Sequence, residues 1–270
     1  MLRERNHYDR MRVTLKGVAA MSEHADAAVT YGSYLKLDEL LSLQQPRSTG
    51  PEHDELLFIV IHQVYELWFK QLLHELDRVK ALLEQDETSR AQHTLKRILT
   101  ILKVMVAQLD ILETMTPLEF LSFRERLEAA SGFQSDQFRQ IEFLLGVKSE
   151  QVVRRFPDGS RGRIALERRY TETTLWDGFL RYLTREGYAV TDVQQALVSL
   201  YKGDAKNAEL CERLVDLDEG IQEWRYRHVK MVERTIGARA GTGGSAGAAY
   251  LRETVGRPLF PDLWAIRSQL

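Results

Sequence analysis

The chain has 270 residues, enough for one large domain or two small ones with a hydrophobic core. Hydrophobic residues make up 44% and charged residues 28% of the sequence, as in soluble globular proteins, so the composition excludes a disordered or fibrous protein. The formal net charge of -2 provides no bulk attraction to nucleic acid or anionic lipid, and we expect neither as a partner.

The cysteine content and the first residues both favour a cytoplasmic protein. The single cysteine, Cys211, excludes an intrachain disulfide and a four-thiolate zinc or iron-sulfur site. Residues 1–13 are charged where a signal peptide needs an apolar core, and no uninterrupted apolar run reaches the roughly 18 residues of a membrane span. We therefore expect a cytoplasmic location and no membrane contact.

Most of the chain shows the apolar spacing of helices, and strand-like alternation is hard to find. No proline falls between residues 52 and 116 or between 158 and 257, which leaves room for long helices. We predict an all-α protein that forms a single large helical bundle. The predicted helices span residues 54–84, 91–113, 117–127, 134–145, 174–186 and 207–235.

Local sequence marks several of these helix ends. Thr116 precedes Pro117, and Glu119 follows at the third helical position, which is the arrangement of a capping box. Thr174 and Asp177 repeat the pattern without the proline. Three glycines stand where helices should end and can close the last turn in the left-handed conformation: Gly146, Gly187 and Gly237.

Two stretches differ from the rest of the chain. Residues 1–30 lack an apolar stripe, and we assign them to an N-terminal arm that precedes the helical domain, residues 31–270. Residues 154–169 are rich in arginine around Pro157-Asp158-Gly159 and are predicted to form a basic, solvated surface loop.

Two histidines interrupt apolar helical patterns. His62 lies in a segment, residues 56–69, that is apolar almost all round, and His228 continues the apolar stripe of residues 207–235. Each is either a core histidine with a hydrogen-bond partner or a group that faces a cavity. Neutral imidazole is a good axial ligand for haem iron. The chain has no Cys-x-x-Cys-His motif for covalent haem, and Cys211 lies within a helical pattern and not in a loop suited to thiolate ligation, which leaves only non-covalent, His-ligated haem.

Arg124 and a glycine-rich run offer further candidate binding groups. Arg124 has apolar neighbours and needs an anion, which is either a substrate carboxylate or a structural Asp or Glu. The run 241–247 lacks the lysine of a P-loop and is either a lid with Thr242 as a donor or a plain connection. Neither a His-Glu-x-x-His zinc motif nor a Gly-x-Ser-x-Gly nucleophile motif occurs, so hydrolase chemistry has no support.

Short motifs occur in a characteristic order over most of the chain. They are Tyr31-Gly32-Ser33-Tyr34-Leu35, His53-Asp54-Glu55, Phe58 to Phe69 with His62-Gln63, Thr116 to Arg124, Ser131 to Ser135, Trp224 to His228, and Gly241 to Gly244. No single motif is specific, but together and in register they resemble the tryptophan 2,3-dioxygenase family.

The resemblance implies a helical, homotetrameric enzyme with its haem pocket between helices. Such an enzyme uses non-covalent haem b in the Fe(II) form and dioxygen to cleave the indole C2-C3 bond of L-tryptophan to N-formyl-L-kynurenine. It implies that His228 is the iron ligand, that the catalytic His62 hydrogen-bonds the indole N-H, and that Arg124 holds the substrate carboxylate. The other implied substrate-binding residues are Phe58, Phe120, Ser131 and Thr242 in the same subunit, and Tyr31, Tyr34 and Leu35 reaching a neighbouring active site.

Two departures from the family pattern keep a related function open. Ala246 stands where we expect a second serine, and the segment 147–227 is shorter than in typical bacterial members. A substituted, for example methylated, tryptophan of secondary metabolism is therefore an alternative substrate, with insertion of one oxygen atom instead of two. The alternative from another class is a cofactor-free helical scaffold in which the histidines and Arg124 are structural groups.

Overall fold

The computed structural model describes residues 28–50, 52–242 and 248–270, which form parts of two units, residues 1–45 and 46–270. The described part of the first unit holds two short helices, α2 (Tyr31–Leu35) and α3 (Leu37–Leu41). Residues 1–27 of the predicted N-terminal arm lie outside the described residues, and the predicted boundary at residue 30 stays a prediction.

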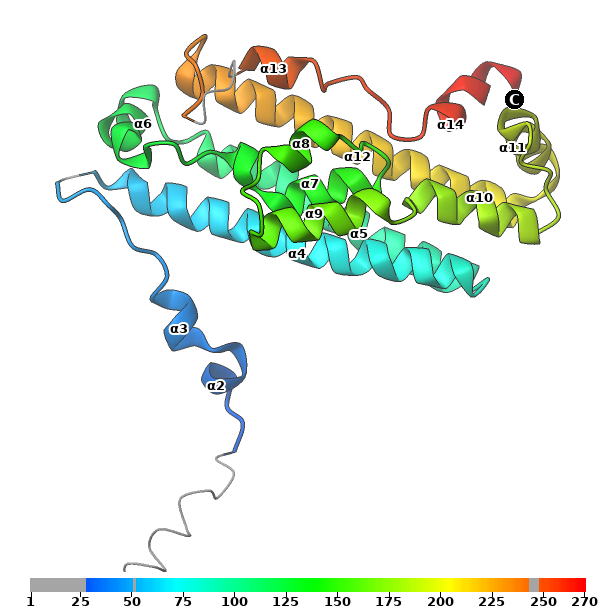
Figure 1. The fold of residues 1–270 in the computed structure, drawn as a ribbon, viewed down its shortest axis with the longest axis horizontal. Helices are drawn as coiled ribbons and strands as arrows, with labels where there is room; N and C mark the ends of the chain where they lie inside the picture. The colour runs from blue at the N-terminus through cyan, green and yellow to red at the C-terminus, as the bar shows by residue number, and fades with distance from the viewer. Residues whose placement is uncertain (1–27, 51, 243–247) are drawn as a thin grey trace, which may run out of the picture. The chain divides into compact units, whose positions relative to one another are not determined.

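Three long helices form the framework of the second unit: α4 (Asp54–Glu84), α5 (Thr88–Leu112) and α12 (Ala205–Ile236). Helix α5 packs against both α4 and α12, and the three run side by side in Figure 1. Their apolar faces build one core. Gly220 permits the close approach of α12 to α5, because a Cβ at this position would lie 3.1 Å from Leu102 Cδ1.

Shorter helices cover this framework, and α7 packs against both α4 and α9. The described residues contain no strand, so the predicted all-α class is confirmed. The shorter helices are α6 (Pro117–Arg124), α7 (Asp136–Leu144), α8 (Glu150–Arg154), α9 (Arg161–Thr171), α10 (Leu175–Arg185), α11 (Val193–Gly203), α13 (Ala248–Arg252) and α14 (Pro261–Ala265), with 3-10 turns at η1 (Glu125–Leu127), η2 (Gly132–Gln134) and η3 (Ile266–Gln269).

The predicted helix ends are confirmed where capping residues mark them. The Thr116 side chain accepts the Glu119 N-H, and the Glu119 carboxylate accepts the Thr116 N-H at 2.7 Å. Thr174 and Asp177 form the same reciprocal pair at the start of α10. The three predicted glycines close their turns with positive φ: 101° at Gly146, 95° at Gly187 and 61° at Gly237.

The predicted basic loop at residues 154–169 is wrong, because helix α9 begins at Arg161. Arg163 and Arg168 pair with acids four residues later, with 2.6 Å between Arg163 Nε and Glu167 Oε1. Spacing of four residues between opposite charges stabilises a helix, not a solvated loop.

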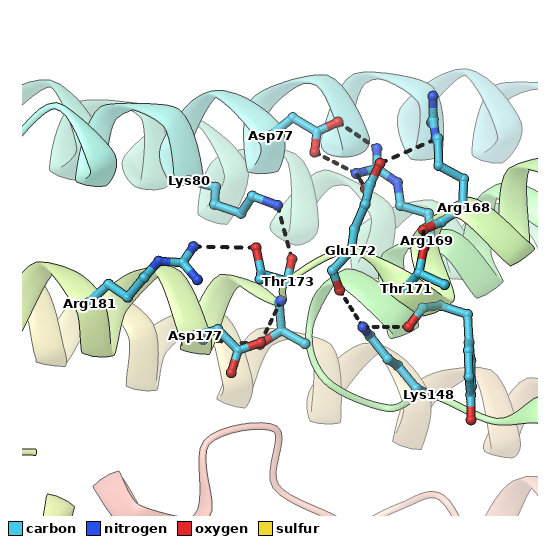
Figure 2. Close-up of polar contacts among 12 residues, drawn as sticks. Asp77, Lys80, Lys148, Arg168, Arg169, Thr171, Glu172, Thr173, Asp177 and Arg181 are labelled. Atoms are coloured by element: carbon cyan, nitrogen blue, oxygen red, sulfur yellow. Dashed lines mark hydrogen bonds and ion pairs between the residues drawn. The ribbon is translucent and has the colours of Figure 1, made fainter. Parts of the chain in front are cut away.

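Arg169 of α9 is buried, and it ties α9 to α4 (Figure 2). Its two terminal nitrogens donate to the two carboxylate oxygens of Asp77 at 2.7 and 2.5 Å. The connection from α9 to α10 is held as well, since Lys80 Nζ donates to the Thr173 carbonyl at 2.9 Å and Lys148 Nζ donates to the Glu172 carbonyl. The contacts of Asp77 and Lys80 hold α9 and the start of α10 against α4.

By length and composition, α4 is the one helix in the described part of the chain that could cross a membrane. A core helix of a soluble protein passes the same test. In its most apolar 18-residue window 28% is buried, and the exposed apolar side chains of α4 are Leu56, Val60 and Leu67.

Candidate active site

A cavity of about 610 Å³ lies among α4, α6, α7 and α12. Its volume falls within the roughly 300–1,000 Å³ of small-molecule and cofactor sites. All its lining residues belong to the second unit, and most are apolar or aromatic. Seven of the residues that the sequence singled out line it: Phe58, His62, Phe120, Arg124, Ser131, His228 and Thr242.

His62, on α4, is held by its own helix. Its Nδ1 lies 2.7 Å from the carbonyl oxygen of Phe58, one turn earlier. Burial lowers the pKa of His62, against the opposing effects of that carbonyl and of Glu66. The ring is therefore neutral, with Nδ1-H as the donor to Phe58 and Nε2 as an acceptor.

His228, on α12, stacks on Trp224 one turn earlier, with ring centres 5.2 Å apart and planes 3° from parallel. Burial, together with the nearby His62 and Arg139, lowers the pKa of His228 to about 4. Its imidazole forms no hydrogen bond with any residue that the structure describes. A neutral imidazole with unused nitrogens beside a cavity suits a metal ligand.

The aromatic residues around His228 fit a flat, largely apolar cofactor that the imidazole would hold. Trp224 meets Phe69 edge to face and Phe138 at a tilt, with ring centres 6.1 and 4.9 Å away. This aromatic packing gives His228 apolar walls, which is the environment that a porphyrin ring requires.

On the His62 side, three phenylalanines form a second aromatic wall. The ring centres of Phe58 and Phe120 are 5.7 Å apart, and Phe123 lies 5.6 Å from Phe58 and 5.5 Å from Phe120. The predicted pair Phe58 and Phe120 therefore does line one wall, next to the His62 ring at 4.1 Å from Phe58. An uncharged aromatic ligand would lose little by entering such a slot.

Arg124, at the end of α6, faces this cavity without an acidic partner. Its Nη2 donates to the Ala240 carbonyl at 2.6 Å, and none of the described Asp or Glu side chains forms an ion pair with it. The sequence left two partners open for Arg124, a substrate carboxylate or an Asp or Glu of the protein. The described residues provide no such Asp or Glu. The remaining guanidinium donors are available to an anion in the cavity.

Ser131 and Thr242 lie at the rim of the cavity. The Ser131 hydroxyl accepts the Phe133 N-H and caps η2. Thr242 Oγ1 donates to the Ala130 carbonyl at 2.6 Å, which places the start of the glycine-rich run against this turn. Residues 243–247, including Ala246, lie outside the described residues.

Comparison with known proteins agrees with this geometry. The model of the tryptophan 2,3-dioxygenase family matches residues 16–177 and 166–270. The chain belongs to the tryptophan 2,3-dioxygenase family. Proteins of that name are 58% identical in Herpetosiphon aurantiacus, over 90% of this chain and 99% of the relative, and 56% identical in Anaeromyxobacter sp. strain K, over 90% and 97%. Another from Myxococcus xanthus is 41% identical over 89% of each chain.

Membership of the tryptophan 2,3-dioxygenase family confirms the resemblance seen in the sequence and makes the chain an oxidoreductase enzyme. The cofactor-free scaffold is not favoured. A substituted tryptophan as substrate and the insertion of a single oxygen atom are not favoured either, because relatives up to 58% identical carry the name tryptophan 2,3-dioxygenase.

The residues predicted to reach a neighbouring subunit belong to the first unit. Tyr31 and Tyr34 of α2 are each 76% exposed, and Leu35 is 41% exposed. Their part in a tryptophan 2,3-dioxygenase active site stays a prediction.

The sequence interpretation missed a cluster of three charged residues in the cavity lining: Arg139 and Glu142 on α7, and Arg225 on α12. All three are buried, and both arginines donate to Glu142. Their signal was available: Arg139 and Glu142 are three residues apart in a short helix, and Arg225 stands three residues before His228. Only the fold brings the two helices together.

Proposed function

We propose that this chain is a haem-dependent dioxygenase that cleaves the indole C2-C3 bond of L-tryptophan and inserts both oxygen atoms to give N-formyl-L-kynurenine. The observation that carries the proposal is that one cavity of a tryptophan 2,3-dioxygenase family member is lined by His62, His228 and Arg124, an arginine that pairs with none of the described acidic side chains. Haem b in the Fe(II) form, held by His228, would supply the activation of dioxygen.

The apolar part of the site would hold the indole ring. Phe58 and Phe120 form a wall next to His62, and a neutral aromatic ring needs such a slot. His62 would accept the indole N-H at Nε2, since Nδ1-H already donates to the Phe58 carbonyl. One hydrogen bond then fixes which edge of the indole faces the reacting oxygen.

The polar part of the site would hold the amino-acid end of tryptophan. Arg124 would bind the carboxylate through its paired guanidinium donors. The Thr242 hydroxyl donates to Ala130, and its lone pairs would meet the ammonium, while Ser131 would line the same side. These contacts position the substrate and exclude water from the reacting carbons, which is the protein's contribution to the rate.

We propose further that the enzyme is a cytoplasmic homotetramer in which Tyr31, Tyr34 and Leu35 complete a neighbour's active site. Their exposure in one chain supports this role. Exposed apolar side chains on α4 and α5 support contacts between subunits: Leu56, Val60, Leu67, Val104 and Ile111. Sedimentation over a range of protein concentrations tests the assembly, and a stable monomer at all concentrations would contradict it.

The activity is tested with protein expressed under adequate haem supply. We expect an intense Soret band and, with L-tryptophan under labelled dioxygen, a product that carries two labelled oxygen atoms by mass spectrometry. A protein without a Soret band would contradict the haem assignment. Incorporation of a single label, or turnover of methylated tryptophans only, would contradict the proposed reaction or substrate.

A further inference from the structure

Two buried arginines share a single carboxylate at the wall of the cavity. Arg139 Nη1 donates to Glu142 Oε2 at 2.5 Å, and Arg225 Nη2 donates to Glu142 Oε1 at 3.1 Å. The side chains of Arg139, Glu142 and Arg225 are 10%, 11% and 6% exposed. Since no other Asp or Glu among the described residues pairs with either arginine, this cluster carries an excess positive charge.

The cluster faces the site and not bulk water. All three residues line the cavity, and Arg225 stands three positions before His228, on the same face of α12. The guanidinium carbon of Arg139 lies 5.3 Å from the ring centre of Phe133 and 5.5 Å from that of Phe138. These rings, also part of the lining, hold the charge at the cavity wall.

The other acids of the lining, Glu66 and Asp136, form no ion pair with Arg139 or Arg225. The Glu66 carboxylate accepts the Gln137 amide at 2.8 Å, and the Asp136 carboxylate accepts the Gln140 amide at 2.9 Å. A buried charge without a counter-ion is unfavourable, so an excess guanidinium that opens into a cavity indicates an anionic ligand group.

We propose that Arg139 and Arg225 bind a carboxylate of the haem, one of the two propionates on the porphyrin edge. This inference rests on the proposed function, because it assumes that the cavity takes haem. The propionates are the anionic substituents of haem b, and a guanidinium binds a carboxylate with two parallel hydrogen bonds. The arginines would thus set the orientation of the porphyrin, and His228 would hold its iron.

The test compares two porphyrins that differ only in these acids: ferric protoporphyrin IX and its dimethyl ester. The full-length chain, prepared free of haem, is titrated with each and followed by the Soret band. We expect the parent to prefer the free acid by about tenfold to a hundredfold, the range for one hydrogen bond to a charged group. Arg139→Gln should lose most of that preference while keeping its affinity for the ester.

Arg139→Gln leaves Glu142 and Arg225 as a neutral pair, so we expect it to fold. Arg169→Gln is the matched control, because Arg169 is equally buried and ion-paired but lies on α9 outside the cavity lining. It should keep the full preference for the free acid. Arg139→Lys, which keeps the charge but loses the planar fork, should show an intermediate preference.

The outcomes separate this inference from the proposed function. If the parent binds both porphyrins with equal affinity, the inference is overturned whatever the variants do. It is also overturned if a folded Arg139→Gln protein loses affinity for both porphyrins to the same extent. If the parent binds neither porphyrin, the haem-dependent function itself fails, and the inference fails with it.

Discussion

His62 donates Nδ1-H to the carbonyl oxygen of Phe58 across 2.7 Å, within one turn of α4. From the sequence, a satisfied core histidine and a ligand-facing histidine were alternatives. The contact shows that they are compatible, because one nitrogen is satisfied inside the helix and the ring still lines the cavity. It also decides the tautomer, leaving Nε2 as the acceptor.

The first prediction concerns this acceptor. We expect His62→Ser to reduce kcat/KM for tryptophan several-fold without abolishing turnover, since the loss of one hydrogen bond costs on the order of 1 kcal/mol. The diagnostic substrate is 1-methyltryptophan, which has no indole N-H and whose methyl group would clash with the imidazole. The variant should therefore discriminate less against it than the parent does. An unchanged ratio of kcat/KM values for the two substrates would show that His62 does not contact the indole nitrogen.

A second prediction concerns the iron ligand. His228→Ala should fold but lose stoichiometric haem, because it removes the imidazole that has no other partner among the described residues. The measurement is the haem content per chain and the ferrous spectrum. His74→Ala, at an exposed position of α4, should keep both. Full haem retention with an unchanged spectrum in His228→Ala would place the ligand elsewhere.

The third prediction concerns the substrate carboxylate. Arg124→Lys keeps the charge but loses the planar pair of donors, so the KM for tryptophan should rise about tenfold or more, as expected for a charged hydrogen bond. Arg126→Lys, at an exposed position two residues later, is the control and should leave KM unchanged. If Arg124→Lys binds tryptophan as tightly as the parent, another group holds the carboxylate.

Structural features that depend on residues close together in the sequence could be predicted. The capping pairs at Thr116 and Thr174 act over three residues, and His62 and His228 interrupt apolar stripes that a helix places on one face. The class and the two histidine positions follow from such local patterns. The convergence of these residues on one cavity followed from the family resemblance, not from spacing.

The features that were missed depend on contacts between distant residues. Arg169 bonds to Asp77, which is 92 positions away in the sequence. Because this partner is so distant, the arginine-rich stretch is predicted to be a solvated loop when only the local sequence is considered. Glu142 likewise meets Arg225 across 83 positions. A charge pattern alone shows neither the burial nor the partner, and both decide whether a charge is structural, functional or solvated.

The fourth prediction concerns Cys211, which is fully buried in α12. Burial raises the pKa of its thiol to about 12, so the reactive thiolate is scarce at neutral pH. We expect no reaction of the native protein with a thiol reagent over the time in which the denatured chain reacts completely. Rapid modification of the folded protein at pH 8 would contradict the placement of this side chain.

The last prediction concerns the ion pair that fixes α9 on α4. Arg169→Gln removes both bonds to Asp77, whose side chain is 42% exposed and can be hydrated in their absence. The loss is therefore smaller than for a fully buried pair, and we expect a decrease of about 1–3 kcal/mol in the free energy of unfolding. Arg154→Gln, which breaks a pair with Glu150 whose side chains are 68% and 62% exposed, should cost less than about 0.5 kcal/mol. Urea unfolding followed by circular dichroism measures both. Equal effects of the two substitutions would show that Arg169 contributes no more than a surface charge does.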